Sequence, residues 1–201
     1  LHISTDFVFD GEQNKPYKDN QKTSPISVYG KTKELGEIAI AEVMRESGQY
    51  LILRTSWLMS VIGNNFAVKM LDLHKKGKEI KVVSDQIGSP TSTTTLAIAC
   101  WKVLEIWMNN QNNITLPETL HWSDRGIASW YEIALAVGII SSNLGIISKP
   151  SFVKAIKTSE FPSIVKRPRY SVLDSSRTRK LLDYSGLEWK ESLKQILISL
   201  K

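Results

Sequence analysis

A tyrosine and a lysine lie four positions apart in the stretch that runs from Tyr29 to Lys33. On a helix, residues with this spacing share one face, so the phenol and the ammonium can point into the same pocket. A cation close to a phenol favours the phenolate, and such a tyrosine can donate or accept a proton near neutral pH. The spacing alone is common in helices, so it indicates chemistry only where the residues around it fit.

Two hydroxyl residues upstream provide that fit. Ser4 and Thr5 end the short run 1–5, which has the composition of a strand. Ligands and reacting groups gather at the carboxyl ends of strands in open α/β sheets. A hydroxyl at a strand end, followed by a tyrosine and a lysine on the next helix, is the arrangement that reduces a carbonyl. The hydroxyl polarises the oxygen, the tyrosine delivers the proton, and the lysine steadies both the tyrosine and the cofactor.

The elements that must position these residues alternate between strand and helix. Residues 50–55 form an apolar run without alternation, which is typical of a strand covered on both faces. Further strands are expected at 1–5, 80–83, 120–122 and 153–156, and helices at about 26–47, 65–76, 93–108, 129–138, 175–182 and 189–200, with a loop at 85–92. This order predicts an α/β fold with a parallel, helix-covered sheet.

Composition narrows the class of protein further. The net charge of +6 suits an anionic small molecule, and the basic residues between 166 and 180 are too few for a nucleic-acid interface. Cys100 lies in an apolar run and is expected to be a buried thiol. The three histidines lack the spacing of metal ligands, so no metal site is predicted. No targeting segment or long apolar span is visible, and we expect a cytoplasmic protein without a membrane partner.

Seven segments, in order along the chain, give a specific resemblance. They are STDFVFDG (4–11), PISVYGKTKELGE (25–37), RTSW (54–57), GNNF (63–66), DQIGSPT (85–91), ASWYE (128–132) and RPRYSVLD (167–174). Their order and spacing resemble the extended short-chain dehydrogenase/reductases, and within these the dTDP-4-dehydrorhamnose reductase family. The resemblance implies that NADPH or NADH reduces the C4 keto group of dTDP-4-dehydro-6-deoxy-L-mannose, which yields dTDP-L-rhamnose for cell-surface polysaccharide.

The resemblance also implies roles for individual residues. Thr5, Tyr29 and Lys33 would be catalytic, with Tyr29 as the general acid for the C4 oxygen. The residues that would contact the cofactor are Ser4, Tyr29, Lys33, Thr55 and Ser56. The residues that would contact the dTDP-sugar substrate are Phe7, Trp57, Asn64, Asn65, Gln86 and Arg167. The guanidinium of Arg167 suits the geometry of phosphate.

Two positions depart from the pattern of this family. Phe7 stands where the family usually has tyrosine, and Met59 stands where it often has another tyrosine. Both departures bear on the details of substrate binding and leave the proton donor intact.

Other residues are expected to have structural roles. The core or a subunit contact is the expected place of Trp101, Trp107, Trp122 and Trp130. We also expect Gly36 to allow a close helix approach and Glu37 to form a surface ion pair.

The resemblance predicts part of a Rossmann-like sheet together with a small mixed α/β substrate-binding region. Residues 1–110 would carry the Tyr-Lys motif, with some substrate-binding segments interleaved, and residues 111–201 would mainly bind the nucleotide sugar. No G-x-G-x-x-G turn occurs; in this family it lies about one hundred residues before the first motif, with the first strands of the sheet. We therefore expect residues 1–201 alone to bind NADPH weakly and to be inactive, with β-type residues 1–5 at an unpaired edge.

Two alternatives stay open at this point. One is a non-catalytic relative that resembles the regulatory β subunit of methionine adenosyltransferase and acts by binding another protein. The other is a different nucleotide-sugar enzyme, such as an epimerase or a dehydratase; the RTSW and DQIGSPT segments favour the reductase over it. The choice between NADPH and NADH, a homodimer and a requirement for Mg²⁺ are left open by the sequence.

Overall fold

The computed structural model describes residues 1–109, 116–163 and 165–201, and a parallel sheet lies at its centre. Its strands are β1 (His2–Thr5), β2 (Ile52–Thr55) and β7 (Thr119–His121), in the order β1-β2-β7. In the register of this sheet, Thr5 is the partner of Thr55, so the two threonines end neighbouring strands together. The parallel sheet predicted from the sequence is confirmed, and β1 lies at its edge among the described strands.

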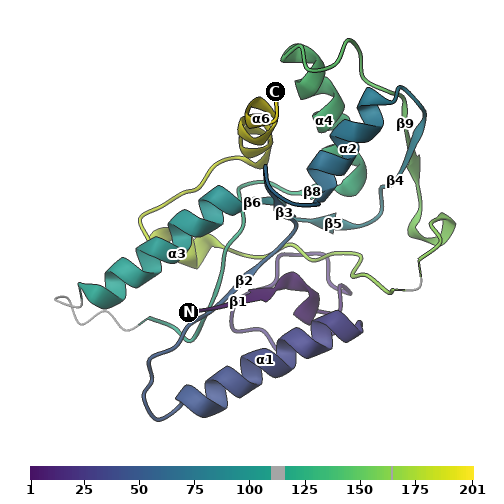
Figure 1. Ribbon diagram of the computed structural model, residues 1–201. Helices are drawn as coiled ribbons and strands as arrows, with labels where there is room; N and C mark the ends of the chain where they lie inside the picture. The colour runs from purple at the N-terminus through teal and green to yellow at the C-terminus, as the bar shows by residue number, and fades with distance from the viewer. Residues whose placement is uncertain (110–115, 164) are drawn as a thin grey trace.

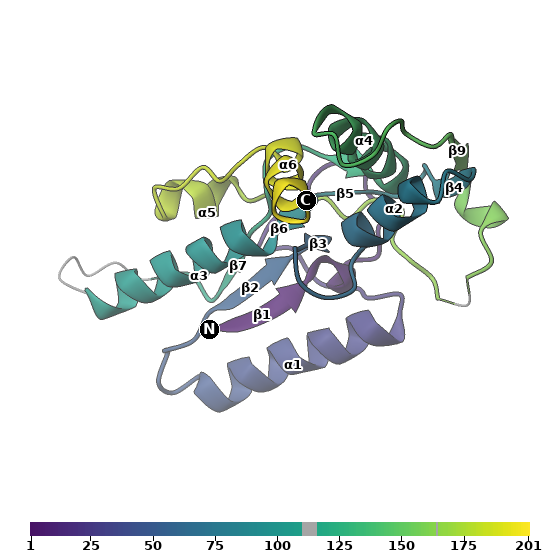
Figure 2. The same cartoon turned by 45° about the horizontal axis from the view of Figure 1, so that its top comes forward.

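Helices cover both faces of this sheet. α1 (Val28–Met44) lies on one side of β1 and β2, and α3 (Thr93–Met108) lies on the other (Figures 1 and 2). Alternate side chains of a strand point to opposite faces, and the two faces differ in character here. Leu53 packs into a buried apolar cluster with residues of α3. Ser4 and Arg54 contact Glu37 of α1 instead.

A second group of elements packs around a larger apolar core. The helices are α2 (Phe66–Lys75), α4 (Trp130–Asn143) and α6 (Trp189–Ser199), with a parallel strand pair β4 (Ile80–Val83) and β9 (Val153–Ile156). Two shorter strand pairs complete it: β3 (Leu58–Met59) with β6 (Thr91–Ser92), and β5 (Ile87–Gly88) with β8 (Ala128–Ser129). The remaining helical elements are η1 (Asp6–Val8), η2 (Thr158–Glu160) and α5 (Ser176–Leu181).

Most helix ends follow local sequence signals. Ser27, Asn65 and Ser129 each accept a hydrogen bond from the first turn of the following helix, as N-cap residues do. Gly77, after α2, has a positive φ of 68°. α4 continues to Asn143, five residues beyond its expected end. The predicted boundary at 110/111 lies outside the described residues.

The short strands β5 and β6 fall where the sequence predicted a loop. They form only through partners that are distant along the chain, so no local pattern announces them. In the part of the chain that the structure describes, no helix combines the length and the apolar character needed to cross a membrane.

Candidate active site

Thr5 is placed by the turn that follows β1. Its side chain caps η1: the Oγ1 atom accepts a hydrogen bond from the backbone N–H of Phe7 at 3.3 Å. The same hydroxyl donates to Oδ1 of Asp6 at 3.1 Å. Asp6 is buried, and desolvation raises its pKa to about 7, although the nearby hydroxyls of Ser171 and Thr5 lower it in part. The hydroxyl predicted to polarise a carbonyl therefore has a protonatable neighbour.

Tyr29 and Lys33 lie on the first turns of α1, which rests directly on η1. Tyr29 is 52% exposed, and its ring meets the ring of Phe7 edge to face, with centroids 5.8 Å apart. Lys33 Nζ donates to the carbonyl oxygen of Ile3 at 2.7 Å. The ammonium is thus held beside β1 one helical turn after the tyrosine. The structure thus places Tyr29 and Lys33 on a helix that rests against the turn and strand end at Thr5.

The close approach of α1 occurs at Gly30. A Cβ atom added there would lie 2.1 Å from the carbonyl oxygen of Phe7, so only glycine fits. At Gly36 the nearest atom to an added Cβ would be on His2 at 3.6 Å, an ordinary contact. The expectation that Gly36 permits a close approach is therefore wrong, and Gly30 has that role.

Glu37 is buried, and the expected surface ion pair is also wrong. Its side chain is paired with Arg54 of β2 through two hydrogen bonds, Nε to Oε1 at 2.9 Å and Nη2 to Oε2 at 2.6 Å. Ser4 Oγ also donates to Glu37 Oε1. Spacing along the helix could show that Glu37 shares a face with Lys33. Its partners, however, come from two strands whose pairing the sequence does not show.

The end of β2 presents a second group of candidate residues. Thr55 is buried, and its Oγ1 atom has no hydrogen-bond partner among the described residues. Ser56 Oγ donates to the carbonyl oxygen of Ser89 at 2.6 Å. Trp57 has a φ of 48°, a backbone conformation that a tryptophan rarely adopts. Its indole stacks on Trp130 with ring centroids 3.6 Å apart.

Gly88 makes room for this tryptophan pair. A Cβ atom added at Gly88 would lie 2.4 Å from Cε2 of Trp57. A strained backbone conformation such as that of Trp57 is kept only where the surrounding packing enforces it, and such residues are found most often at functional sites. Trp130 was expected in the core or in a subunit contact. It packs against the core and, in addition, forms part of a pocket wall.

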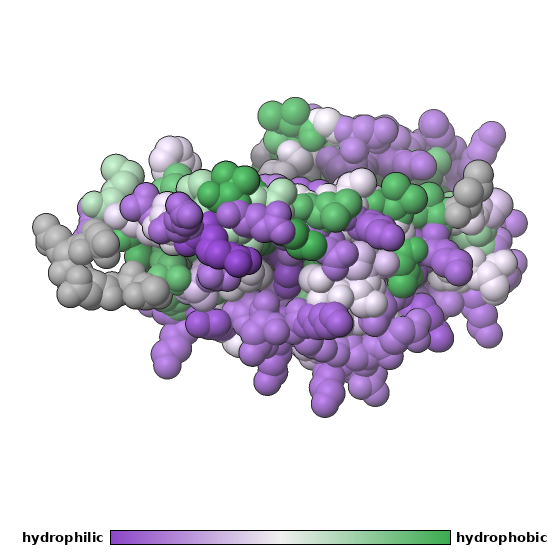
Figure 3. All heavy atoms as spheres, turned by 90° about the horizontal axis from the view of Figure 1, so that it is seen from below, coloured by the Kyte–Doolittle hydropathy of each residue, from purple (hydrophilic) through white to green (hydrophobic). Residues whose placement is uncertain are grey.

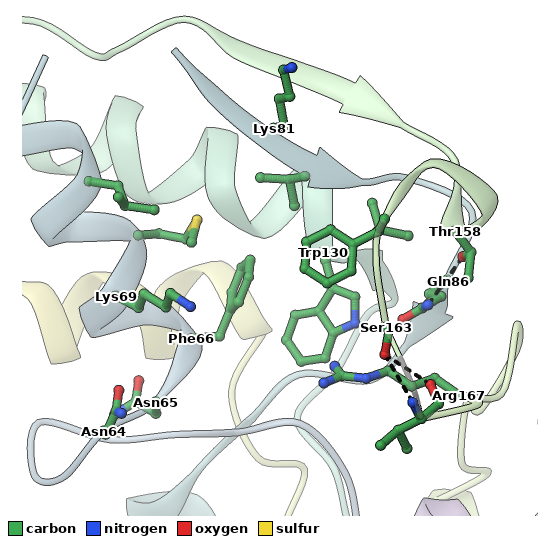
Figure 4. A pocket seen from close by; sticks show the side chains of 16 residues that line it. Asn64, Asn65, Phe66, Lys69, Lys81, Gln86, Trp130, Thr158, Ser163 and Arg167 are labelled. Atoms are coloured by element: carbon green, nitrogen blue, oxygen red, sulfur yellow. Dashed lines mark hydrogen bonds between the residues drawn. The ribbon is translucent and has the colours of Figure 1, made fainter. Parts of the chain in front are cut away.

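The pocket has a volume of about 480 Å³ and gathers residues from α2, β4, α4 and the segment after β9 (Figure 4). Four predicted substrate contacts line it: Asn64, Asn65, Gln86 and Arg167. Lining residues that the sequence did not assign to the substrate include Phe66, Lys69, Lys81, Trp130, Thr158 and Phe161. None of the described lining residues is acidic, so the pocket favours an anion.

The polar groups of this pocket are held in different ways. Gln86 Nε2 donates to Thr158 Oγ1 at 3.1 Å, and Asn65 Oδ1 caps α2 by accepting from Val68 N at 3.3 Å. In Figure 4, Lys69 lies beside Phe66 and Arg167 lies below the indole of Trp130, whereas the ammonium of Lys81 points away. Lys69 and Arg167 are therefore the cations best placed for a bound phosphate.

The predicted residues thus form two clusters. Thr5 ends β1, with Tyr29 and Lys33 on the adjacent α1. Asn64, Asn65, Gln86 and Arg167, the predicted nucleotide contacts, line the pocket, and Trp57 stands beside it through its stack on Trp130. Within residues 1–109, 116–163 and 165–201, no three His, Cys, Asp or Glu side chains are grouped so that they could hold a metal ion.

Comparison with known proteins agrees with this α/β architecture and these motifs. The family model described as the RmlD substrate binding domain matches residues 1–201. The chain belongs to this family, and its resemblance to the dTDP-4-dehydrorhamnose reductases is confirmed. It is 36% identical over 200 residues to the spore coat polysaccharide biosynthesis protein SpsK of Bacillus subtilis, covering 98% of the chain and 63% of that protein.

Two solved structures are similar throughout the chain. A dTDP-4-dehydrorhamnose reductase from Clostridium acetobutylicum has a TM-score of 0.84 at 38% identity, covering 99% of this chain and 65% of that one. The enzyme of the same name from Bacillus anthracis, solved in complex with NADP, has a TM-score of 0.80 at 33% identity, covering 98% and 64%. The chain therefore spans just under two thirds of the length of these relatives.

Proposed function

We propose that this chain is the proton-transfer and substrate-binding portion of a dTDP-4-dehydrorhamnose reductase. The reaction is reduction of the C4 keto group of dTDP-4-dehydro-6-deoxy-L-mannose to dTDP-L-rhamnose. The observation that carries the proposal is the placement of Tyr29 and Lys33 on a helix that lies against the strand end at Thr5. The family match over residues 1–201 and the names of the relatives support it.

In this proposal, each residue of the first cluster has a separate task. Tyr29 gives its proton to the C4 oxygen as that oxygen gains negative charge. Thr5 polarises the carbonyl when its hydroxyl proton turns from Asp6 Oδ1 toward the same C4 oxygen. Lys33, anchored on the carbonyl of Ile3, keeps a positive charge one helical turn from the phenol. This charge favours the phenolate that remains after proton transfer.

NADPH or NADH, when bound, supplies the hydride. The buried Thr55 hydroxyl has no partner among the described residues, and a cofactor polar group at the end of β2 would satisfy it. We propose that Thr55 and the neighbouring Ser56 line the cofactor site with Lys33 and Tyr29. Ser4 was also predicted to contact the cofactor, but its hydroxyl donates to Glu37 and so already has a partner within the protein. The Bacillus anthracis relative, solved with NADP, supports a nicotinamide cofactor.

The pocket is proposed to bind the nucleotide diphosphate. Arg167 and Lys69 would contact the phosphates, because a guanidinium and an ammonium both bind phosphate oxygens. Asn65 and Gln86 offer amide groups at the same wall. Trp130 and Phe66 offer aromatic surface, with ring centroids 4.6 Å apart. Phe7 and Trp57 would then border the sugar between the two clusters.

The first test is turnover by the full-length protein that carries this chain. NADPH consumption should depend on the 4-keto sugar nucleotide, and Tyr29→Phe should lower kcat by about 10²- to 10⁴-fold, the usual contribution of a general acid. Tyr131→Phe on α4 is the matched control and should leave kcat unchanged. Wild-type turnover by Tyr29→Phe would contradict the assignment of the proton donor.

The same assay separates the alternatives. Absence of turnover together with stable capture of a synthetase subunit would favour the regulatory relative. Conversion of the sugar without net NADPH consumption would favour an epimerase. We also infer a cytoplasmic location, because nucleotide sugars and NADPH are made there. A homodimer stays a prediction, which sedimentation of the full-length protein would test.

A further inference from the structure

The helix that carries Tyr29 and Lys33 is held against the sheet by polar contacts. Gly30 and Glu37 are the buried residues of α1, and none of the three hydrophobic clusters of described residues includes a residue from it. Its apolar side chains Leu35, Ile38 and Val43 are between 47% and 80% exposed. Seen from below the view of Figure 1, hydrophobic residues lie among hydrophilic ones in the upper half of the surface, and the lower edge is largely hydrophilic (Figure 3). Among the described residues, therefore, no apolar cluster holds α1 against the sheet.

Glu37 supplies a directional contact in place of that packing. It follows Lys33 by four residues and Tyr29 by eight, so the three side chains share one stripe of the helix. The two parallel hydrogen bonds from Arg54, at 2.9 and 2.6 Å, restrict both the distance and the orientation of the carboxylate. A helix held in this way can neither rotate nor slide without breaking the pair.

The partners of Glu37 connect it to the strand ends that carry the proposed chemistry. Ser4 and Arg54 are register partners in β1 and β2, and both donate to the Glu37 carboxylate. The residues that follow them are Thr5 and Thr55. The carboxylate thus binds the side chains that immediately precede the catalytic hydroxyl and the proposed cofactor contact. Lys33 adds a third contact through the carbonyl of Ile3.

Arg54 is itself held in position. Its guanidinium lies over the ring of Phe9 at 5.2 Å from the centroid, and its Nη1 atom is 3.5 Å from the carbonyl oxygen of Asp19. Both members of the pair are almost fully buried. A buried ion pair loses much of its Coulombic gain to desolvation, so apolar replacements of similar volume often keep or raise stability. What such a pair adds is a defined geometry.

We propose that Glu37 and Arg54 are positioning residues, which set the place of Tyr29 and Lys33 relative to Thr5. The proposal rests on the proposed reductase function. It assigns the pair an effect on the rate of the chemical step, because a displacement of about 1 Å in a reacting group lowers rates by about 100-fold. The nucleotide-sugar pocket lies on other elements and keeps its geometry.

The test compares two variants of the full-length protein. Glu37→Met/Arg54→Met removes both charges and preserves volume; Glu37→Gln keeps an acceptor for Ser4 and Arg54. We expect the double variant to keep a cooperative melting transition while kcat falls about 10- to 100-fold. KM for the sugar nucleotide should change less than about twofold, because uniform binding is not affected. Glu37→Gln should retain more kcat than the double variant.

Hydrogen exchange provides a readout that does not need turnover. Peptides from α1 should exchange faster in the double variant than in the wild type, and the exchange of peptides from α3 and α6 should be unchanged.

Arg177→Met, which removes the exposed ion pair with Asp19, is the matched control and should change neither kcat nor exchange in α1. Wild-type kcat and wild-type exchange of α1 in the double variant would overturn the proposal. An inactive wild type would instead overturn the reductase assignment, and the exchange result would still decide the role of the pair.

Discussion

Asp6 sits next to the proposed catalytic hydroxyl and carries a carboxyl group that burial keeps from ionising easily. Thr5 donates to one of its oxygens, and the other has no hydrogen-bond partner among the residues that the structure describes. Desolvation is the largest influence and raises the pKa of Asp6 to about 7, compared with 3.8 for a free aspartate. The folded protein therefore holds a proton on Asp6 at pH values where the unfolded chain has lost it.

This difference predicts the pH dependence of stability. Between about pH 4 and pH 7 the folded state binds more protons, so the free energy of unfolding should fall as pH rises, by up to about 1.4 kcal/mol per pH unit from this group. Above pH 7 the effect is complete. Asp6→Asn should remove this contribution, so that the variant loses less stability between pH 5 and pH 7 than the wild type. Urea unfolding at both pH values measures it; equal losses in the two proteins would contradict the burial argument.

At the scale of elements, the contact between α1 and η1 decides where the proposed proton donor lies. Gly30 allows the helix to touch the backbone of Phe7, and the carbonyl oxygen there cannot move without disturbing the turn that Thr5 caps. Gly36, on the same helix, has no such contact. The two glycines therefore offer a comparison in which the same substitution meets different surroundings.

Gly30→Ala should destabilise the protein by about 1–3 kcal/mol and lower kcat, because the added methyl group forces α1 away from η1. Gly36→Ala should stabilise it by about 0.5–1 kcal/mol and leave kcat unchanged, since alanine is the better helix former. Thermal melting and steady-state kinetics of both variants measure these effects. Similar behaviour of the two would show that the close contact at Gly30 is unimportant.

At the scale of the whole molecule, the pocket exists because distant segments meet. One wall comes from α2 and the residues just before it, another from Trp130 on α4, and a third from the segment that includes Thr158 and Arg167. Two cations and no described carboxylate face the space, as a diphosphate requires. In the proposed function, proton transfer and nucleotide binding fall to different elements, so they should respond to mutation separately.

Arg167→Met should weaken dTDP binding about 10-fold or more, because charge-assisted hydrogen bonds to phosphate are lost. Its effect on kcat at saturating substrate should be small. Lys166→Met removes the same charge from an adjacent exposed residue that does not line the pocket, and it should leave binding nearly unchanged. Calorimetric titration with dTDP measures both. Equal weakening in the two variants would indicate a general effect of charge and no specific contact.

Much of this protein is determined locally and could be predicted from its sequence. The strand at 153–156 and the helix at 93–108 were predicted at their observed bounds, because the length and apolar character of each segment indicate its type of element. Tyr29 and Lys33 could be paired in advance because a helix brings residues four apart to one face. The order of the motifs along the chain indicated the family, and the family resemblance in turn predicted a catalytic role for Thr5 and a substrate contact for Arg167.

Only the tertiary structure decided the features that depend on segments far apart in the chain. Glu37 was predicted at the surface, yet it is buried because Ser4 and Arg54 become neighbours when β1 pairs with β2. Trp130 lines a pocket because α4 packs beside α2 and against Trp57. Periodicity reports which face of an element is apolar but not which element covers it, and a buried charge is stable only where that covering element supplies its partner.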